Sequence, residues 1–396
     1  MRLFKLGPEA LLSPRRRNVF AFISLAVIIL AVYSNSFDAS WHFDDRQNIL
    51  ERNAMHLTKL NWSQIKKTFF NEDGNIYRPI PCLTFALNYY FGKTRVFGYH
   101  VVNIAVHILT SFFLFLFVFH TLRLPSLMKR YGQDAYFIAL LAAVLWAINP
   151  LHTQAVTYIV QRMAGMAAMF TIMSMFFYLK GRTSKDRRKA VLHFSACAVS
   201  GLMAVASKEN AAMLPFSLLL FDLFLIQGLS RRSILRSSSI FLILIIVPLA
   251  LMIFLRGPDI FHRILISDYD IRRPFTIGQR LLTEPKVIFF YLSLLFYPMP
   301  FRLSLTHDMT LSQGLLHPIS TLLAILGIIF IVAGCFIGGR RFPLICYCIL
   351  FFFMNHVIEG SAFALELLFE HRNYLPSMLL FVPVAILLVK SIRHFV

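Results

Sequence analysis

Long runs of apolar residues, separated by short polar segments, make up most of this chain. The first run covers residues 18–36. Six more lie near residues 98–121, 135–149, 163–179, 190–206, 211–228 and 239–255, and three further runs lie between 316 and 391. A helix needs about 20 mostly apolar residues to cross a bilayer. The pattern therefore predicts an all-α integral membrane protein, a single polytopic membrane domain over residues 1–396 with about ten transmembrane helices.

Two long intervals interrupt this pattern, residues 37–97 and residues 256–315, and both are rich in polar and aromatic residues. Within the second interval, the apolar stretch 287–297 is bounded by Pro285 and Pro298. At about 11 residues, this stretch is short for a transmembrane span. We expect it to form a short re-entrant or interfacial helix within an outer loop.

Positive charge is spread over the loops between the apolar runs. The chain has 39 Lys and Arg against 19 Asp and Glu, which gives a formal net charge of +20. Basic residues gather at positions 15–17, 180–189, 231–236 and 340–341. Because cytoplasmic loops are enriched in Lys and Arg, we expect both termini inside and the two long intervals outside. Charge distributed in this way does not form the single basic patch of a nucleic-acid-binding protein.

The first outer interval opens with Trp41-His42-Phe43-Asp44-Asp45, just beyond the first apolar run. Carboxylates near hydrocarbon are costly, so this pair needs a functional or a structural reason. A carboxylate beside an acceptor hydroxyl could act as a general base. Alternatively, Asp44 or Asp45 could cap a helix that starts near Gln47. One residue of the pair could also serve each purpose.

A polar stripe marks the start of the second apolar run. His100, Asn103 and His107 are spaced by three and four residues, so they share one face of the predicted helix. Such a stripe should face protein or a water-filled cavity and not lipid. We expect it to line a substrate cavity, and hydrogen bonding between helices is the alternative. No carboxylate at a fitting spacing completes a metal site here.

Other polar residues lie in segments that this topology places on the outer side. They are His42, Arg78, His152, Gln154, Arg162, Lys208, Glu209, His307, Asp308, Glu370, His371 and Arg372. An arginine there suits a phosphate at the membrane surface, because guanidinium donates two parallel hydrogen bonds. The alternative for residues 366–376 is an interfacial anchor with Tyr374.

Short motifs follow one another in order along nearly the whole chain. They are Tyr33-Ser34-Asn35-Ser36-Phe37, His42-Phe43-Asp44-Asp45, Tyr77-Arg78-Pro79, Gly98-Tyr99-His100, Asn149-Pro150-Leu151-His152, Ser207-Lys208-Glu209-Asn210, Thr306-His307-Asp308 and Glu370-His371-Arg372-Asn373. With these motifs, the chain resembles the membrane portion of the GT-C glycosyltransferase superfamily. Within it, the chain is similar to the transmembrane-and-tetratricopeptide-repeat proteins related to protein O-mannosyltransferases. The resemblance implies a GT-C-type helix bundle.

The resemblance also implies an activity: an inverting glycosyltransferase that moves a sugar from a polyprenyl-phosphate-linked donor to a protein or glycan acceptor. Asp44 occupies the position of the aspartate in the mannosyltransferases' Asp-Glu pair, and Asp45 replaces the glutamate, which implies a catalytic role for the pair. Arg78, Lys208 and Arg372 are then expected to bind the donor phosphate. The implied location is the periplasmic face of a bacterial inner membrane, or the lumenal face of the endoplasmic reticulum.

Two features leave alternatives open. We find no 34-residue repeat in the sequence, so we expect the acceptor-binding module of the repeat proteins to be missing, separate or unnecessary. A transporter or flippase of a lipid-linked substrate would also place polar groups among helices, although transporters tend to show paired halves with broken helices. A non-catalytic membrane assembly protein is the third hypothesis.

No cofactor is required by any motif, but Asp44, Asp45, His307 and Asp308 could hold a divalent cation.

Overall fold

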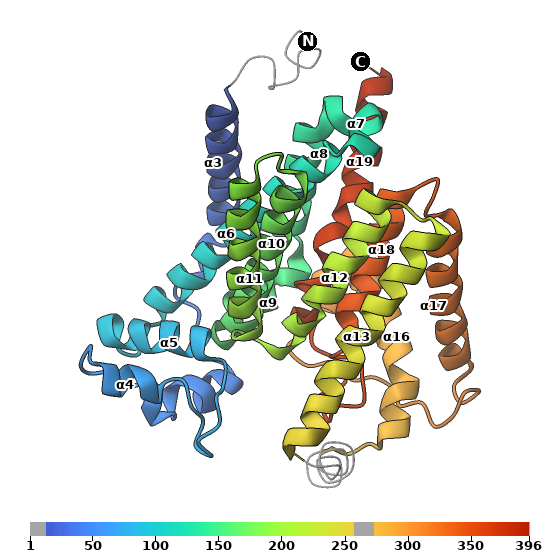
Figure 1. The fold of residues 1–396 in the computed structure, drawn as a ribbon. Helices are drawn as coiled ribbons and strands as arrows, with labels where there is room; N and C mark the ends of the chain where they lie inside the picture. The colour runs from blue at the N-terminus through green and yellow to red at the C-terminus, as the bar shows by residue number, and fades with distance from the viewer. Residues whose placement is uncertain (1–12, 257–272, 396) are drawn as a thin grey trace. The chain divides into compact units, whose positions relative to one another are not determined.

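The computed structural model describes residues 13–256 and 273–395, and within these ranges the chain is helical. The nearest approach to sheet structure in the described part is an isolated bridge between Phe70 and Ile76. This confirms the all-α prediction. The chain divides into two compact units, residues 1–212 with 381–396 (unit 1) and residues 213–380 (unit 2) (Figure 1).

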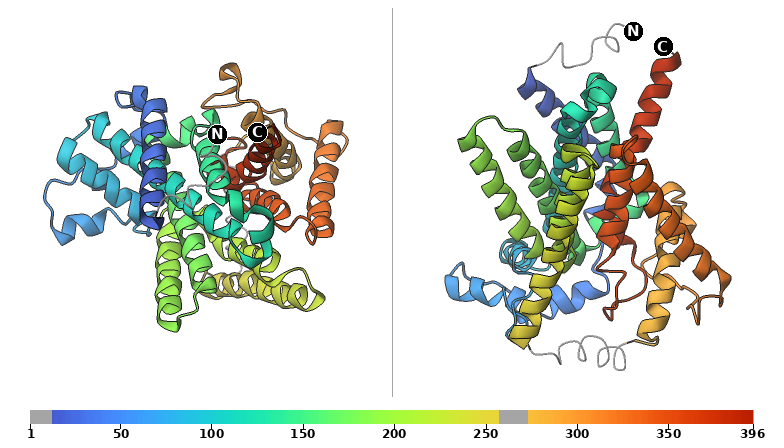
Figure 2. Two further views of the ribbon diagram at one scale, coloured as in Figure 1. Left: turned by 90° about the horizontal axis from the view of Figure 1, so that it is seen from above. Right: turned by 45° about the vertical axis from the view of Figure 1, so that its right-hand side comes forward.

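Unit 1 holds the first outer interval and the helices around it (Figure 1). Its helices are α3 (Pro14–Val32), α4 (Trp62–Lys67), α5 (Pro79–Gly92), α6 (Val96–Leu122), α7 (Pro125–Tyr131), α8 (Ala135–Ala147), α9 (Thr153–Thr157), α10 (Arg162–Thr183), α11 (Arg187–Val205) and α19 (Phe381–Phe395). In both Figures 1 and 2, α10 and α11 form an antiparallel pair, as their short connection requires. Val106 of α6 packs with Met166 and Phe170 of α10 in the core of this unit.

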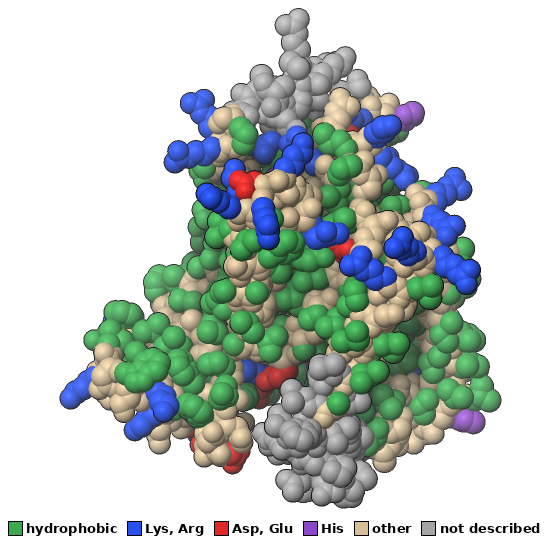
Figure 3. Space-filling model, viewed as in Figure 1, with side chains coloured by type: hydrophobic (Ala, Val, Ile, Leu, Met, Phe, Trp, Pro, Cys, Tyr) green, Lys and Arg blue, Asp and Glu red, His purple; other side chains and the backbone are tan. Residues whose placement is uncertain are grey.

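The two ends of unit 1 differ in charge. Tyr136 at the start of α8 donates to the Arg17 carbonyl near the start of α3, and Tyr33 after α3 donates to the Ala147 carbonyl at the end of α8. These two helices are therefore parallel. Lys and Arg side chains gather over the turn between α10 and α11 (Figure 3), whereas residues 37–95 lie at the other end. The separation agrees with the topology expected from loop charge.

Unit 2 contains the helices α12 (Leu214–Phe221), α13 (Arg231–Arg256), α16 (Ile277–Phe296), α17 (Ile319–Gly338) and α18 (Pro343–His356). A π-helical segment, Asp222–Gln227, continues α12. Arg340, in the turn between α17 and α18, donates to the carbonyl of Leu229 at 3.0 Å. The basic loops 231–236 and 340–341 therefore lie at one end of this unit, as expected for two loops on the same side of a membrane.

Helix α16 corrects one prediction. The short apolar stretch 287–297, expected to be bounded by Pro285, is part of a 20-residue helix that contains Pro285 in its interior. A capping box between Thr276 and Gln279 starts this helix. After α16 the chain runs back alongside this helix. Two hydrogen bonds show this path: Lys286 donates to the carbonyl of Thr310, and the backbone N–H of Ser312 donates to the hydroxyl of Thr283. The helix is longer than expected, and its re-entrant or interfacial placement stays a prediction.

Five helices in the described part are long and apolar enough to cross a membrane, or six if one bent pair is a single span. They are Val96–Leu122, Ile159–Thr183, Glu209–Gln227, Ile319–Gly338 and Pro376–Phe395, and the bent pair is Pro125–Ala147 with Pro150–Thr157. Only 17% of the apolar window in Ile319–Gly338 is buried, so most of this helix would face lipid. The protein is a multi-pass membrane protein, and the number of ten spans stays a prediction.

Candidate functional site

The two acids of the first outer interval lie in very different surroundings. The Asp45 side chain is completely buried, and its two oxygens accept hydrogen bonds from the backbone N–H of His42 (3.0 Å) and of Val160 (2.7 Å). Burial raises the pKa of Asp45 to about 6, although both N–H donors act in the opposite direction. Asp45 therefore ties the loop after α3 to the segment that precedes α10.

Asp44 is exposed, and its backbone is held on both sides. Its N–H donates to the hydroxyl of Tyr158 at 2.7 Å, and its carbonyl accepts from the side-chain amide of Asn48 at 2.9 Å. The preceding residue, Phe43, has a positive φ of 34°, which is uncommon for a residue other than glycine. A carboxylate on a fixed backbone that remains open to solvent has the arrangement expected of a general base. The catalytic role of the pair stays a prediction.

Arg78 lies on the same side of unit 1, next to Tyr77. Its guanidinium pairs with the carboxylate of Glu209, with Nη2 to Oε2 at 2.7 Å and Nε to Oε1 at 3.1 Å. Glu209 is 62% exposed, whereas the side chain of Arg78 is 22% exposed. The hydroxyl of Tyr77 reaches Asn48 at 3.4 Å, and Asn48 in turn contacts Asp44. Two intervening residues thus connect Arg78 with the exposed acid.

Lys208 and His42 differ in burial. Lys208, beside Glu209, is 9% exposed, and its backbone N–H donates to the Ala204 carbonyl. His42 is exposed, and its ring lies 3.5 Å from the hydroxyl of Ser40. The structure therefore places Arg78, Lys208 and Glu209 together, while His42 lies in the loop that carries the acidic pair.

The polar stripe of α6 is buried and makes hydrogen bonds with neighbouring segments. His100 contacts the carbonyl of Ala39 (3.0 Å), and His107 contacts the carbonyl of Ala147 (2.9 Å). Asn103 donates to the carbonyls of Val156 and Ile159. These contacts match the alternative of hydrogen bonding between helices, and the role of the stripe in lining a substrate cavity stays a prediction.

Arg162, at the start of α10, makes hydrogen bonds to several neighbouring elements. Its guanidinium donates to the side chain of Asn103 (2.7 Å), to the hydroxyl of Thr84 (3.0 Å) and to the carbonyl of Tyr99 (2.9 Å). The same group lies over the ring of Phe85, 4.5 Å from its centre. Arg162 thereby links α10 with α5 and α6. Its position inside this network is that of a residue that holds helices together.

His152 and Gln154 follow the bend after α8 and are buried. The His152 ring packs against Trp146, with the ring centres 5.0 Å apart. Both residues lie between α8 and the segment 158–162 that contacts the acidic pair.

The remaining predicted residues belong to unit 2. Glu370 accepts from His307 at 2.8 Å and from the backbone N–H of Ser304 at 2.7 Å, so it joins its own segment to residues 304–307. Asp308 is exposed. His371 stacks on the ring of Phe369, and buried Arg372 lies over the same ring and donates to the carbonyl of Leu367.

Sequence reasoning missed two contributors. Tyr158 holds the backbone of Asp44, but a lone tyrosine after a short helix carries no signal for this role. In unit 2, Arg280 is completely buried, and it donates to the carbonyls of Glu359, Ser361 and Leu365 and pairs with Glu284. The spacing of Arg280 and Glu284, an i,i+4 pair in a polar half-helix, was the available signal.

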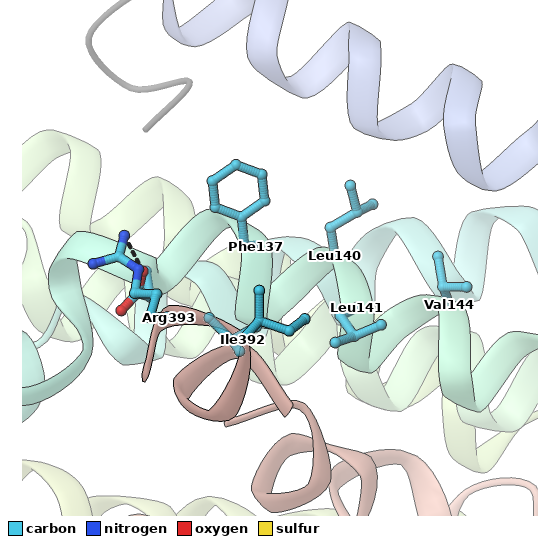
Figure 4. A pocket seen from close by; sticks show the side chains of 8 residues that line it. Phe137, Leu140, Leu141, Val144, Ile392 and Arg393 are labelled. Carbon is cyan, nitrogen blue, oxygen red and sulfur yellow. Dashed lines mark ion pairs between the residues drawn. The ribbon is translucent and has the colours of Figure 1, made fainter. Parts of the chain in front are cut away.

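The described residues contain no group of three or more His, Cys, Asp and Glu side chains arranged to hold a metal ion. One apolar groove of about 300 Å³ lies between α8 and α19, lined by residues such as Phe137, Leu141 and Ile392 (Figure 4). An ion pair between Arg393 and Asp134 marks one end of it. The lining extends along α8 as far as Val144, and these apolar walls suit lipid chains better than sugar.

Sequence comparison relates the chain to curated proteins. It is 28% identical over 172 residues to protein O-mannosyl-transferase F38B6.6 of Caenorhabditis elegans. It is 28% identical over 218 residues to protein O-mannosyl-transferase TMTC3 of Mus musculus, and 29% identical over 195 residues to TMTC4 of Homo sapiens. The chain is similar to the TMTC protein O-mannosyl-transferases. This confirms the resemblance expected from its motifs.

The matched segments cover 42% to 53% of this chain, but only 22% to 25% of these TMTC-type relatives. The chain therefore corresponds to a part of each relative, and their names describe the activity of much longer proteins. No protein-family model and no solved structure matches the chain.

Proposed function

We propose that this protein is an inverting glycosyltransferase that moves a sugar from a polyprenyl-phosphate-linked donor to a protein on the non-cytoplasmic side of a membrane. The observation that carries the proposal is the arrangement of the acidic pair. Asp45 is buried and hydrogen-bonded, and Asp44 beside it is exposed on a backbone that Tyr158 and Asn48 hold in place. The similarity to protein O-mannosyl-transferases supports the class of reaction and suggests mannose as the sugar.

In the proposed reaction, an acceptor hydroxyl oxygen attacks the anomeric carbon of the sugar from the face opposite the phosphate. The bond between this carbon and the phosphate oxygen breaks as the new glycosidic bond forms, and polyprenyl phosphate leaves with the bonding electrons. Asp44 takes the hydroxyl proton. General-base assistance of this kind typically contributes about 10²- to 10⁴-fold to a rate.

Arg78 and Lys208, both in unit 1, are the proposed phosphate ligands, and the expected role of Arg372 in binding the phosphate stays a prediction. Arg78 is already paired with Glu209, but Glu209 is mostly exposed. Ion pairs at an exposed surface contribute only about 0–1 kcal/mol. The phosphodiester of the donor carries one negative charge, and the leaving polyprenyl phosphate gains a second. Either anion could therefore replace the carboxylate of Glu209 on the guanidinium at little cost.

The orientation in the membrane follows from charge. The Lys and Arg residues at the α10–α11 turn would face the cytoplasm, so the opposite end of unit 1, with Asp44, would face the periplasm of a bacterium or the lumen of the endoplasmic reticulum. The donor's lipid would remain in the bilayer while its phosphate reaches the membrane surface beside Arg78.

The test is sugar transfer by the reconstituted protein from polyprenyl-phosphate mannose to a peptide that contains Thr. Asp44→Asn should lower the transfer rate about 10²- to 10⁴-fold and leave the unfolding temperature unchanged, because its side chain is exposed. Asp38→Asn is the matched control, since Asp38 is an exposed acid of the same loop, and it should retain transfer. Equal transfer by wild type and Asp44→Asn would exclude Asp44 as the base. No transfer by the wild type would contradict the proposed function.

A further inference from the structure

Two polar hollows adjoin one another in the first outer interval of unit 1. One has a volume of about 400 Å³ and is lined in part by Asn48, Glu51 and Tyr77. The other has a volume of about 640 Å³ and is lined in part by Ser63, Lys66 and Lys67. Both are lined by Arg52, Asn71 and Glu72, so they adjoin across these three residues, and we call the two hollows together the groove.

The two hollows carry opposite charge. The first, the acidic hollow, is lined by the three carboxylates Glu51, Glu72 and Asp73 and by one guanidinium, that of Arg52. The second, the basic hollow, is lined by three cations, Lys66, Lys67 and Arg52, and by one carboxylate, that of Glu72. Arg46 pairs with Glu51 at 2.5 Å, but both side chains are more than half exposed, so the pair is weak and exchangeable.

The wall between the hollows is fixed by hydrogen bonds. Arg52 is 8% exposed and donates to the carbonyl of Phe70 at 2.6 Å and to the sulfur of Cys82 at 3.2 Å. The side chain of Asn71 accepts from the backbone of Asn75 at 2.8 Å, which closes the turn 71–75. Because these protein groups are already ordered, binding of a ligand there would cost them little conformational entropy.

The acidic hollow is connected to the exposed acid. Tyr77, which lines this hollow, reaches Asn48 at 3.4 Å, and Asn48 donates to the carbonyl of Asp44 at 2.9 Å. Asn48 is itself part of the lining. The groove therefore runs from the neighbourhood of Asp44 through the acidic hollow and on to the basic hollow.

We propose that this groove binds an extended segment of the acceptor polypeptide and selects it by charge. The acceptor Ser or Thr would lie at Asp44, a Lys or Arg of the same segment in the acidic hollow, and an Asp or Glu farther along in the basic hollow. The inference rests on the proposed function for the role of Asp44. The side chains of Asn48, Asn53 and Asn71 can pair with peptide groups, and the opposite charges suit a polypeptide better than a neutral glycan.

Binding is measured with fluorescent peptides and the purified full-length protein in detergent. Matched peptides carry Thr, Lys and Glu in the order of Asp44, the acidic hollow and the basic hollow, and are made with this order running from either terminus. In swapped peptides, Lys and Glu exchange places. We expect matched peptides to bind about three- to tenfold more tightly at low salt, because exposed charge pairs each contribute a few tenths to 1 kcal/mol. Salt should reduce the difference.

The double variant Lys66→Glu, Lys67→Glu should lose this preference. Lys59→Glu is the matched control, because Lys59 is an exposed lysine of the same loop that does not line the groove, and it should keep the preference. Unfolding temperatures of both variants show whether the loop remains folded. Equal binding of matched and swapped peptides by the wild type would overturn the proposal, as would tighter binding of a neutral mannose oligosaccharide.

Failure of this inference differs from failure of the proposed function. Peptide binding is measured without the sugar donor, so its result does not depend on the transfer reaction. If sugar transfer occurs with equal KM for matched and swapped peptides, the groove does not select the acceptor, but the enzyme activity stands. If the peptide preference is present and no transfer occurs, the groove binds polypeptide and the proposed reaction is wrong.

Discussion

The contrast between the two neighbouring acids leads to a prediction about pH and stability. The Asp45 carboxyl is completely buried, and burial raises its pKa from 3.8 to about 6. In the unfolded chain this carboxyl would titrate at its ordinary value. The folded protein therefore binds the proton more tightly than the unfolded chain does, and protonation of Asp45 stabilises the fold.

The magnitude follows from the difference between the two pKa values. A difference of about two pH units corresponds to about 3 kcal/mol, at 1.36 kcal/mol for each unit. This contribution is fully present below about pH 4, declines as the pH rises through the interval from about 4 to 6, and is lost above it. Asp45→Asn removes the titrating group. Between pH 4 and pH 7, the unfolding free energy of the wild type should therefore fall by about 3 kcal/mol relative to that of Asp45→Asn.

The assay is chemical unfolding in detergent micelles, followed by tryptophan fluorescence between pH 4 and pH 7. Trp41 lies in the acidic loop, 4.8 Å from Tyr99 between ring centres, so its emission should report opening of this loop. Asp38→Asn, at an exposed acid of the same loop, serves as the control and should follow the pH dependence of the wild type. Parallel curves for wild type and Asp45→Asn would refute the reasoning. A shift of the opposite sign would mean that the two N–H donors outweigh burial.

Three further predictions concern single side chains. Arg162→Met should lower the unfolding free energy of unit 1 by about 3–5 kcal/mol, since it leaves buried acceptors without their donor, and chemical unfolding measures this. Arg280→Met should expose the loop 359–366 of unit 2 to proteolysis, because this loop loses the donor for four of its carbonyls, whereas Arg341→Met, in a distant basic loop, should not. Glu209→Gln should leave the unfolding free energy within about 1 kcal/mol of the wild type, because the Glu209 side of its ion pair is mostly exposed. It should also lower the KM for the lipid-linked donor by freeing Arg78, and an unchanged or raised KM would contradict a phosphate-binding role.

Much of the helical fold could be predicted from the sequence, because bilayer thickness sets the length of apolar runs. The run predicted at 98–121 is the helix Val96–Leu122, and the run at 135–149 is the helix Ala135–Ala147. The prediction was wrong for α16, whose first half contains Arg280 and Glu284 and is too polar to look like a buried helix. The carbonyls that accept from Arg280 lie about 80 residues farther along the chain, and no local sequence pattern predicts these contacts.

The contacts of the candidate site residues were largely not predictable from the sequence, and their functional roles stay predictions. The sequence pointed to the acidic pair but could not show which acid is buried and which is exposed. The backbone N–H that donates to the Asp45 side chain belongs to Val160, 115 residues away. The helical spacing of His100, Asn103 and His107 correctly indicated one face of α6. Their partners are backbone carbonyls, which every residue possesses, so the sequence contains no information about which carbonyl each side chain selects.

The segment from Tyr158 to Arg162 makes its contacts at every second residue: Tyr158 with Asp44, Val160 with Asp45, and Arg162 with Asn103. Inserting or deleting one residue here would offset all three contacts at once, and compensating substitutions elsewhere could not restore them. Related chains that keep the acidic pair should therefore preserve the number of residues in this segment, even where surface loops such as 297–318 vary in length. In related chains, the length of this segment should therefore vary less than its residues do.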